Sequence, residues 1–297
     1  MQWLATITGW QLAMEKDLKI IECPRDAMQG MDSFIASEKK VDYLNKLLTV
    51  GFNTLDFGSF VSPKAVPQMS DIQDVVGQLN LADTATELLA IIANLRGAEA
   101  AASYQQIHYL GYPMSISETF QYKNTNKSIV QSLEELVAIS ELCQLKNKQL
   151  VIYISMAFGN PYGDNYNPDI VTQFAGVLES LGAAVISLAD TVGLATADEV
   201  TALFTEVKSI STQVEWGVHL HAAPQDARAK IKAAIAAGCR RIDGALLGYG
   251  GCPMADNELV GNINTRTIIE VAKELGFESN INQSRFIEAE LMASTIF

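Results

Sequence analysis

The residues of this chain best suited to chemistry are a carboxylate, two imidazoles and an amide that stand far apart in the sequence. Asp26 lies in the string PRD, His219 and His221 form the string HLH, and Asn262 follows a glycine-rich segment. The chain has three histidines in all, and two of them stand only two residues apart. Imidazole and oxygen ligands without a thiolate favour a six-coordinate Mg²⁺ or Mn²⁺ ion over structural zinc.

Three further side chains could move charge or protons beside such an ion. Arg25 directly precedes Asp26, and its permanently charged fork of N–H donors suits an oxyanion that develops during a reaction. Cys252 lies in the string GYGGCPMA, where a thiol could donate or accept a proton. Asp190, in SLADTVG, could orient a metal-bound water, accept a hydroxyl proton or cap the next turn. This set is typical of an enzyme that breaks a carbon–carbon bond and holds the resulting enolate.

The same residues also have structural interpretations. The two histidines could be hydrogen-bonded core residues, and Arg25 could form a salt bridge with Asp56. Asn262 could cap the N-terminus of a helix, where asparagine is common. Asp26 favours the metal site, because it ends a predicted strand and would point into the same mouth as the histidines.

Short apolar segments alternate with longer segments of helical spacing, which are clearest at 37–50 and 128–145. Alternation of this kind predicts an α/β fold whose parallel sheet is covered by helices. The predicted strands are 18–23, 54–60, 88–93, 107–112, 150–156, 184–190, 215–221 and 241–247. This series predicts a (β/α)₈ TIM barrel, whose active site lies at the carboxyl ends of the strands. An open doubly wound sheet is the alternative, but the glycine-rich turn expected after its first strand is missing.

We expect one catalytic domain over residues 1–297, with the barrel at about 17–276 and a C-terminal helical extension at about 277–297. The extension could cap the barrel or meet another subunit. We expect a homodimer or a higher homo-oligomer.

The chain carries a formal net charge of −13, which argues against nucleic acid or an anionic membrane as a partner. The four cysteines, Cys23, Cys143, Cys239 and Cys252, are too widely spaced for a zinc knuckle and are expected to be reduced thiols. No signal peptide or membrane-spanning segment is evident, so a cytoplasmic location is expected.

Taken together, PRD, SFVSPKAVPQM, SLADTVG, HLH, and GGCP followed by GN resemble the 3-hydroxy-3-methylglutaryl-CoA lyase family over roughly residues 19–276. The resemblance implies a TIM barrel that uses a divalent metal to cleave this acyl-CoA substrate to acetyl-CoA and acetoacetate, by a retro-Claisen or retro-aldol mechanism. SFVSPKAVPQM is the most specific string.

The resemblance also implies a role for each matching residue. The metal ligands would be Asp26, His219, His221 and Asn262. Arg25 would stabilise the enolate, Cys252 would move a proton, and Asp190, Asp56 and His219 would take part in catalysis. Ser59, Asn124 and Ser187 would lie near the acyl or pantetheine part of the substrate.

The chain departs from the family pattern around these residues. Cys23 and Ala27 stand where the family usually has glycine. Asp56 is acidic like the family residue at the end of the second strand, but its side chain is shorter. Ala222 replaces a carboxylate, and Arg266 stands where glutamate is usual. The last two changes remove negative charge near the predicted site and would favour a more anionic substrate.

Two other functions are compatible with these departures. A related aldolase or Claisen-type enzyme would use the same metal site on another hydroxyacyl-CoA, or on a 2-oxo or hydroxy acid. A non-catalytic relative would only bind acyl-CoA or metal.

Overall fold

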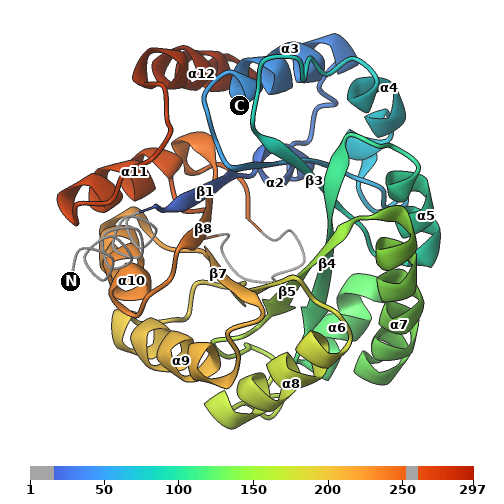
Figure 1. The fold of residues 1–297 in the computed structure, drawn as a ribbon, viewed down its shortest axis with the longest axis vertical. Coiled ribbons are helices and arrows are strands. Elements are labelled where there is room, and N and C mark those ends of the chain that lie inside the picture. Colours follow the sequence, from blue (N-terminus) through green and yellow to red (C-terminus); the bar gives the residue numbers. More distant parts are fainter. Residues whose placement is uncertain (1–16, 252–259) are drawn as a thin grey trace, which may run out of the picture.

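The computed structural model describes residues 17–251 and 260–297, which form a closed barrel of parallel strands surrounded by helices (Figure 1). The strands follow one another around the barrel in sequence order, and β1 closes it by pairing with both β2 and β8. They are β1 Lys19–Glu22, β2 Thr54–Ser59, β3 Glu87–Ile91, β4 Ile107–Ser115, β5 Gln149–Ser155, β6 Val185–Asp190, β7 Glu215–Leu220 and β8 Arg241–Gly244.

Helices form the outer ring, and apolar side chains fill the layer between them and the barrel. The helices are α2 Pro24–Gln29, α3 Ser37–Leu48, α4 Ile72–Val76, α5 Leu95–Ala102, α6 Glu118–Thr125, α7 Ile129–Lys146, α8 Pro168–Ser180, α9 Ala197–Ile210, α10 Pro224–Ala236, α11 Thr265–Glu274 and α12 Gln283–Ile296. Two 3₁₀ turns, η1 Pro67–Met69 and η2 Leu246–Gly248, lie in the loops that follow β2 and β8.

The predicted (β/α)₈ barrel is confirmed, and the open sheet is excluded because β1 and β8 pair. Two strands end three residues away from their predicted limits. β4 continues to Ser115 because it stays paired with β5 as far as Ser155. β8 ends at Gly244 because the chain turns into η2, where Leu247 has a φ of 61° that a strand cannot accommodate.

The barrel interior is apolar on one side and charged on the other. Six side chains from β3 to β6 form a compact apolar cluster: Leu89, Ile91, Tyr109, Val151, Tyr153 and Val185. The buried charges Asp56, Arg241 and Asp243 come from β2 and β8. Because alternate strand residues face the lumen, this division follows from the sequence of each strand.

The C-terminal helix α12 covers the flank of the barrel beside α3 (Figure 1). Phe286 packs edge-on against Phe52 with ring centroids 6.4 Å apart, and Phe297 meets Tyr43 at 5.9 Å. The extension therefore packs on its own barrel, and the homo-oligomer stays a prediction. None of the helices in the described ranges is long and apolar enough to cross a membrane.

A buried acid joins β1 to the loop that follows β8. Glu22 is fully buried and accepts hydrogen bonds from the Leu246 N–H at 2.7 Å and the Thr265 hydroxyl at 2.6 Å. Burial raises the pKa of Glu22 to about 8, although these two bonds lower it. The folded protein therefore retains a proton on Glu22 at neutral pH.

This retained proton predicts a pH-dependent stability. In the unfolded chain Glu22 titrates near its ordinary pKa of 4.5, so its contribution to stability is complete below that pH and is lost as pH rises through about 8. Glu22→Gln keeps one acceptor and one donor and should remove this loss. At about pH 9 its free energy of unfolding should exceed that of the wild type by roughly 3–5 kcal/mol, with little difference at about pH 5.

Urea unfolding across this pH range measures the effect. Glu99→Gln, at an exposed position on α5, is the matched control and should follow the wild type. Parallel pH profiles for Glu22→Gln and the wild type would contradict the prediction.

Candidate active site

A cavity of about 200 Å³ contains six of the residues predicted for the site. They come from the carboxyl ends of the strands and the segments that follow them, where a TIM barrel carries its active site. The six are Arg25, Asp26, Ser59, Asn124, His219 and His221. The tertiary fold therefore brings together parts of the chain that are separated by nearly two hundred residues.

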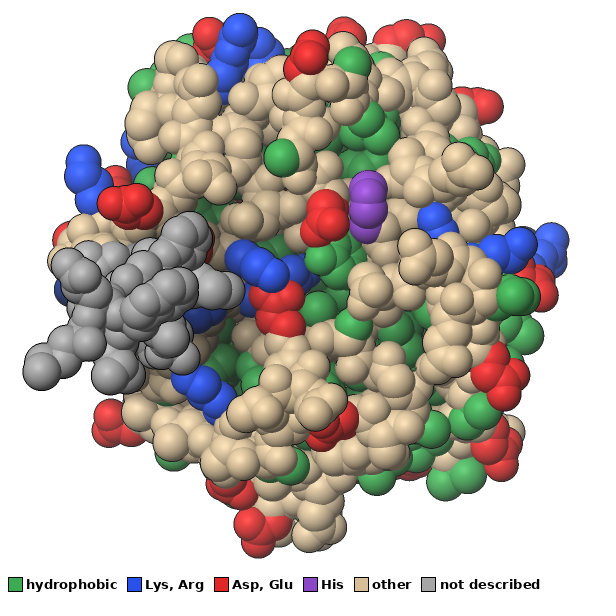
Figure 2. Space-filling model, in the orientation of Figure 1, with side chains coloured by type: hydrophobic (Ala, Val, Ile, Leu, Met, Phe, Trp, Pro, Cys, Tyr) green, Lys and Arg blue, Asp and Glu red, His purple; other side chains and the backbone are tan. Residues whose placement is uncertain are grey.

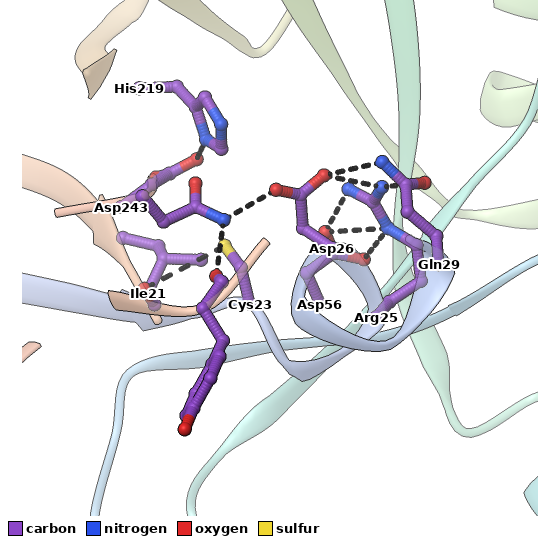
Figure 3. A network of polar contacts seen from close by, with 10 residues as sticks. Ile21, Cys23, Arg25, Asp26, Gln29, Asp56, His219 and Asp243 are labelled. Atoms are coloured by element: carbon purple, nitrogen blue, oxygen red, sulfur yellow. Dashed lines mark hydrogen bonds and ion pairs between the residues drawn. The ribbon is translucent and has the colours of Figure 1, made fainter. Parts of the chain in front are cut away.

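Arg25 lies at the centre of a buried ionic network (Figure 3). Its Nε donates to the two carboxylate oxygens of Asp56 at 3.2 and 3.1 Å, and its Nη2 donates to Asp56 Oδ2 at 2.5 Å. Its Nη1 donates to Asp26 at 2.9 Å and to Gln29 at 2.8 Å. The predicted salt bridge between Arg25 and Asp56 is confirmed. The short helix α2 and strand β2 are thus joined through one guanidinium.

Both carboxylates of this network are ionised at neutral pH. Burial raises the pKa of Asp56 to about 6, against the lowering effect of Arg25. Burial also opposes ionisation of Asp26, but the charge of Arg25, the interactions with the two histidines and the hydrogen bond from Asn262 outweigh it and lower the pKa of Asp26. Asp26 is therefore a charged oxygen donor at the cavity wall.

The two histidines are held by different acceptors. His219 Nδ1 lies 3.1 Å from Asp243 Oδ2, and His221 Nδ1 lies 3.1 Å from the carbonyl oxygen of Val260. Their ring centroids are 5.1 Å apart. When Nδ1 donates to such an acceptor, Nε2 is left as the basic nitrogen that a metal can use.

The charge states of the two histidines differ. Burial and the neighbouring His219 lower the pKa of His221 to about 4, so His221 is neutral at neutral pH. Burial also lowers the pKa of His219, but the hydrogen bond and charge of Asp243 outweigh this and raise it. His219 is therefore the more basic ring.

Asn262 is oriented by its amide nitrogen. Nδ2 donates to Asp26 Oδ2 at 2.6 Å and to the carbonyl oxygen of Tyr249 at 2.9 Å, so the amide oxygen points away from these acceptors. The alternative that Asn262 is a helix cap is excluded, because Asn264 caps α11. The structure thus connects the segment after β8 directly to Asp26.

These donors fit a hard divalent cation. One carboxylate, one amide and two imidazoles, each oriented by a hydrogen bond to the protein, are suited to Mg²⁺ or Mn²⁺. Among the histidine, cysteine and acidic residues of the described ranges, the group whose ligand atoms all lie within 4.8 Å of one another is Cys23, His219 and Asp243. Burial raises the pKa of the Cys23 thiol well above its ordinary value.

Asp190 is directed away from the cavity. Its carboxylate pairs with Lys230 Nζ at 2.7 Å and accepts from the Ala195 N–H at 3.2 Å. Lys230 also donates to the carbonyl oxygens of Gly193 at 3.1 Å and His221 at 2.9 Å. Three roles were predicted for Asp190. The structure shows one of them, because Asp190 holds the turn that follows β6.

The remaining predicted residues occupy different environments. Ser59 and Asn124 line the cavity, whereas Ser187 belongs to β6 and is not part of its wall. The hydroxyls of Ser59 and Ser187 are buried and have no hydrogen-bond partner among the described residues. Cys252 lies outside the described residues.

Three residues of the site were not predicted from the sequence. Gln29 bonds both Arg25 and Asp26, and its place one helical turn after Arg25 could have indicated this. Asp243 could have been found from strand alternation in β8. Lys230 carries no such signal, because it is one of several polar residues on α10.

The two departures that remove negative charge have different consequences. Ala222 is buried next to His221 and leaves that position without a carboxylate. Arg266 pairs with Glu290 of α12, and its guanidinium lies 5.2 Å from the ring of Phe286. Arg266 is not part of the cavity wall, so its charge is directed to α12 and not to a substrate.

The fold and this site define a barrel enzyme with a charged, metal-compatible centre, and the comparisons with known proteins agree. The HMGL-like family model matches residues 18–292. The mouse protein named mitochondrial hydroxymethylglutaryl-CoA lyase is 30% identical over 288 residues, covering 96% of this chain and 87% of the relative. A Pseudomonas aeruginosa protein named 3-hydroxy-3-isohexenylglutaryl-CoA/hydroxymethylglutaryl-CoA lyase is 29% identical, covering 93% and 91%.

Solved structures give the same result. An HMG-CoA lyase from Acinetobacter baumannii, in complex with coenzyme A and 3-methylmalate, superposes with a TM-score of 0.88 at 29% identity, over 95% of this chain and 92% of that one. The Brucella melitensis HMG-CoA lyase gives 0.87 at 29% identity, over 94% and 98%. The chain belongs to the HMGL-like family. The predictions of this family and of a carbon–carbon lyase are confirmed.

The buried ion pair between Asp190 and Lys230 predicts a stability effect. Lys230→Met leaves Asp190 buried without its cation and should lower the free energy of unfolding by about 3 kcal/mol or more. Adding Asp190→Asn removes the stranded charge and should restore part of the loss. Chemical denaturation of both variants measures this, with Lys232→Met, at an exposed position on α10, as the control. Equal losses in the single and double variants would contradict the coupling.

Proposed function

We propose that this protein cleaves 3-hydroxy-3-methylglutaryl-CoA to acetyl-CoA and acetoacetate with Mg²⁺ or Mn²⁺ as cofactor. The observation that carries the proposal is that Asp26, His219 and His221 line one cavity with the buried guanidinium of Arg25, and that Asn262 is hydrogen-bonded to Asp26. The names of the relatives support the choice of substrate. One neighbour crystallised with coenzyme A supports an acyl-CoA ligand.

The proposed metal ligands are Asp26, His219, His221 and Asn262. When bound, the ion would polarise the tertiary hydroxyl and a neighbouring carboxylate oxygen of the substrate and lower the pKa of that hydroxyl. Asp243 and the carbonyl of Val260 would keep the two imidazoles in the orientation that presents Nε2.

Cleavage then requires that a base remove the hydroxyl proton, so that C3 becomes the ketone carbon of acetoacetate. The electron pair of the C2–C3 bond passes to the thioester and forms an enolate. Proton return to C2 gives acetyl-CoA. The hydroxyl proton passes to the base, a proton is delivered to C2, and the electron pairs move within the substrate, so no step needs an oxidant.

Arg25 is placed to stabilise the enolate. A guanidinium has five N–H donors, and the contacts to Asp56, Asp26 and Gln29 occupy Nε, both hydrogens of Nη1 and one of Nη2. Among the described residues no contact uses the second Nη2 hydrogen, which is left for the developing oxyanion. Because the other bonds hold the group rigidly, this donor needs little reorganisation during the reaction.

The other predicted roles are proposals of the same mechanism. Cys252 would exchange the proton, and Ser59 and Asn124, which line the cavity, would contact the acyl or pantetheine part of the substrate. Ser187, outside the cavity wall, is proposed for the same part of the substrate. Asp190 would contribute by holding the loop after β6 and, through Lys230, the carbonyl of His221. A homo-oligomer and a cytoplasmic location complete the proposal, the latter in keeping with a rat relative named as cytoplasmic.

The metal requirement is tested by assaying acetoacetate release with Mg²⁺ or Mn²⁺ and again after chelation. Release should depend on the metal and should fall by about a hundredfold or more in His219→Ala, because a ligand is lost. His108→Ala, at an exposed position on β4, is the matched control and should stay active. Undiminished activity after exhaustive chelation would refute the proposal.

The substrate is tested by competing reactions. The related alternative, an aldolase or Claisen-type enzyme, predicts turnover of small CoA-free hydroxy acids and none of the CoA thioester. A non-catalytic relative predicts tight acyl-CoA binding without turnover of any thioester.

The proposed thiol chemistry predicts a selective loss of rate. Cys252→Ser should reduce turnover by roughly 10²–10⁴-fold, the usual contribution of a positioned proton donor, while substrate binding stays close to normal. Cys143→Ala, on α7, is the cysteine control, because no catalytic role is proposed for Cys143. Steady-state kinetics separate kcat from KM, and an unchanged kcat would rule out the proton-transfer role.

A further inference from the structure

A second cavity, of about 380 Å³, lies at the opposite end of the barrel from the candidate active site. Its wall includes the residues at which four strands begin: Lys19 of β1, Thr54 of β2, Glu87 of β3 and Arg241 of β8. Figure 2 shows basic and acidic side chains gathered close together near the middle of one barrel face.

Arg241 is the unusual residue of this cavity. It is 1% exposed, yet neither of its terminal nitrogens has a hydrogen-bond partner among the described residues. The closest carboxylate oxygen belongs to Glu215, 3.8 Å away, and Glu215 is already paired with Lys19 at 2.8 Å. A buried guanidinium normally has its N–H groups satisfied, because leaving them unbonded costs free energy.

The fold makes room for this side chain. Gly217 lies on the neighbouring strand β7, and a Cβ there would come within 3.2 Å of both Cδ and the carbonyl oxygen of Arg241. The absence of a side chain at Gly217 lets the aliphatic stem cross the lumen. The guanidinium also lies 5.4 Å from the ring of Tyr109, another residue of the cavity wall.

The unbonded donors of the wall favour a negative ligand. Lys19 and Arg241 supply two positive charges, and Glu87 supplies one negative charge, while Glu87 also accepts the Tyr109 hydroxyl at 2.8 Å. Glu215 beside the wall supplies a second negative charge, but it pairs with Lys19 and comes no nearer than 3.8 Å to the Arg241 guanidinium. A guanidinium fork with both terminal nitrogens unbonded matches the two oxygens of a carboxylate or a phosphate.

We propose that this cavity is a binding site for a small oxyanion, a phosphate or a carboxylate, held by Arg241 with Lys19 as the second cation. The site is separate from the candidate active site and does not depend on the proposed lyase reaction. The bound oxyanion satisfies both terminal nitrogens of Arg241.

The test is calorimetric titration of the full chain with inorganic phosphate and, separately, with acetate, at fixed ionic strength. We expect saturable binding of at least one, and the stronger of the two identifies the preferred oxyanion. Arg241→Met should weaken binding by about tenfold or more, as expected when hydrogen bonds to a charged group are removed. Arg285→Met, which removes an exposed arginine on α12, should bind like the wild type.

Two further variants keep the proposal testable if Arg241→Met does not fold. Lys19→Met removes a half-exposed cation and should weaken binding. Arg241→Lys keeps the charge but loses the fork and should also weaken binding. No saturable binding by the wild type would overturn the proposal, since water would then satisfy Arg241. Binding that is unchanged in every folded wall variant would overturn it as well, because the oxyanion would then bind elsewhere.

Discussion

The buried guanidinium of Arg25 is the interaction on which the candidate active site depends. It bridges Asp56 of β2 to Asp26 of α2, and Asp26 is in turn bonded by Asn262 from the segment after β8. Three parts of the barrel mouth are thereby tied to one cation. Removing that cation would leave two carboxylates buried without a counter-charge, which is among the more costly changes that a protein interior can undergo.

The same network sets the chemistry of the site. The positive charge of Arg25, with the neighbouring histidines and the hydrogen bond from Asn262, keeps Asp26 ionised in spite of its burial, so the cavity presents an anionic oxygen beside imidazole nitrogens. Asp243 performs a related task for His219 by engaging Nδ1. The departures from the family pattern fall around this centre and do not break it, because Asp56 still reaches Arg25 and Arg266 is engaged by α12.

The two ends of the barrel contrast in how they treat a buried arginine. At the carboxyl ends of the strands, Arg25 has nearly all its donors satisfied by protein groups. At the other end, Arg241 has both terminal nitrogens unbonded within the described structure. In the proposed function the first arrangement holds a donor for the developing oxyanion, and in the proposed oxyanion site the second leaves a cation for a diffusible ligand.

The sequence by itself determined the alternation of strands and helices, and with it the barrel. Apolar periodicity is a local property, so each strand was placed within a few residues. The strings PRD, HLH and SFVSPKAVPQM likewise identified the family and the residues of the metal-compatible centre. Tertiary structure alone decided which side chains pair across the barrel. Asp190 pairs with Lys230, and Arg266 pairs with Glu290. The residue that caps α11 is Asn264 and not Asn262. The sequence could not predict these ion pairs, because they depend on distances between segments that are remote in the chain.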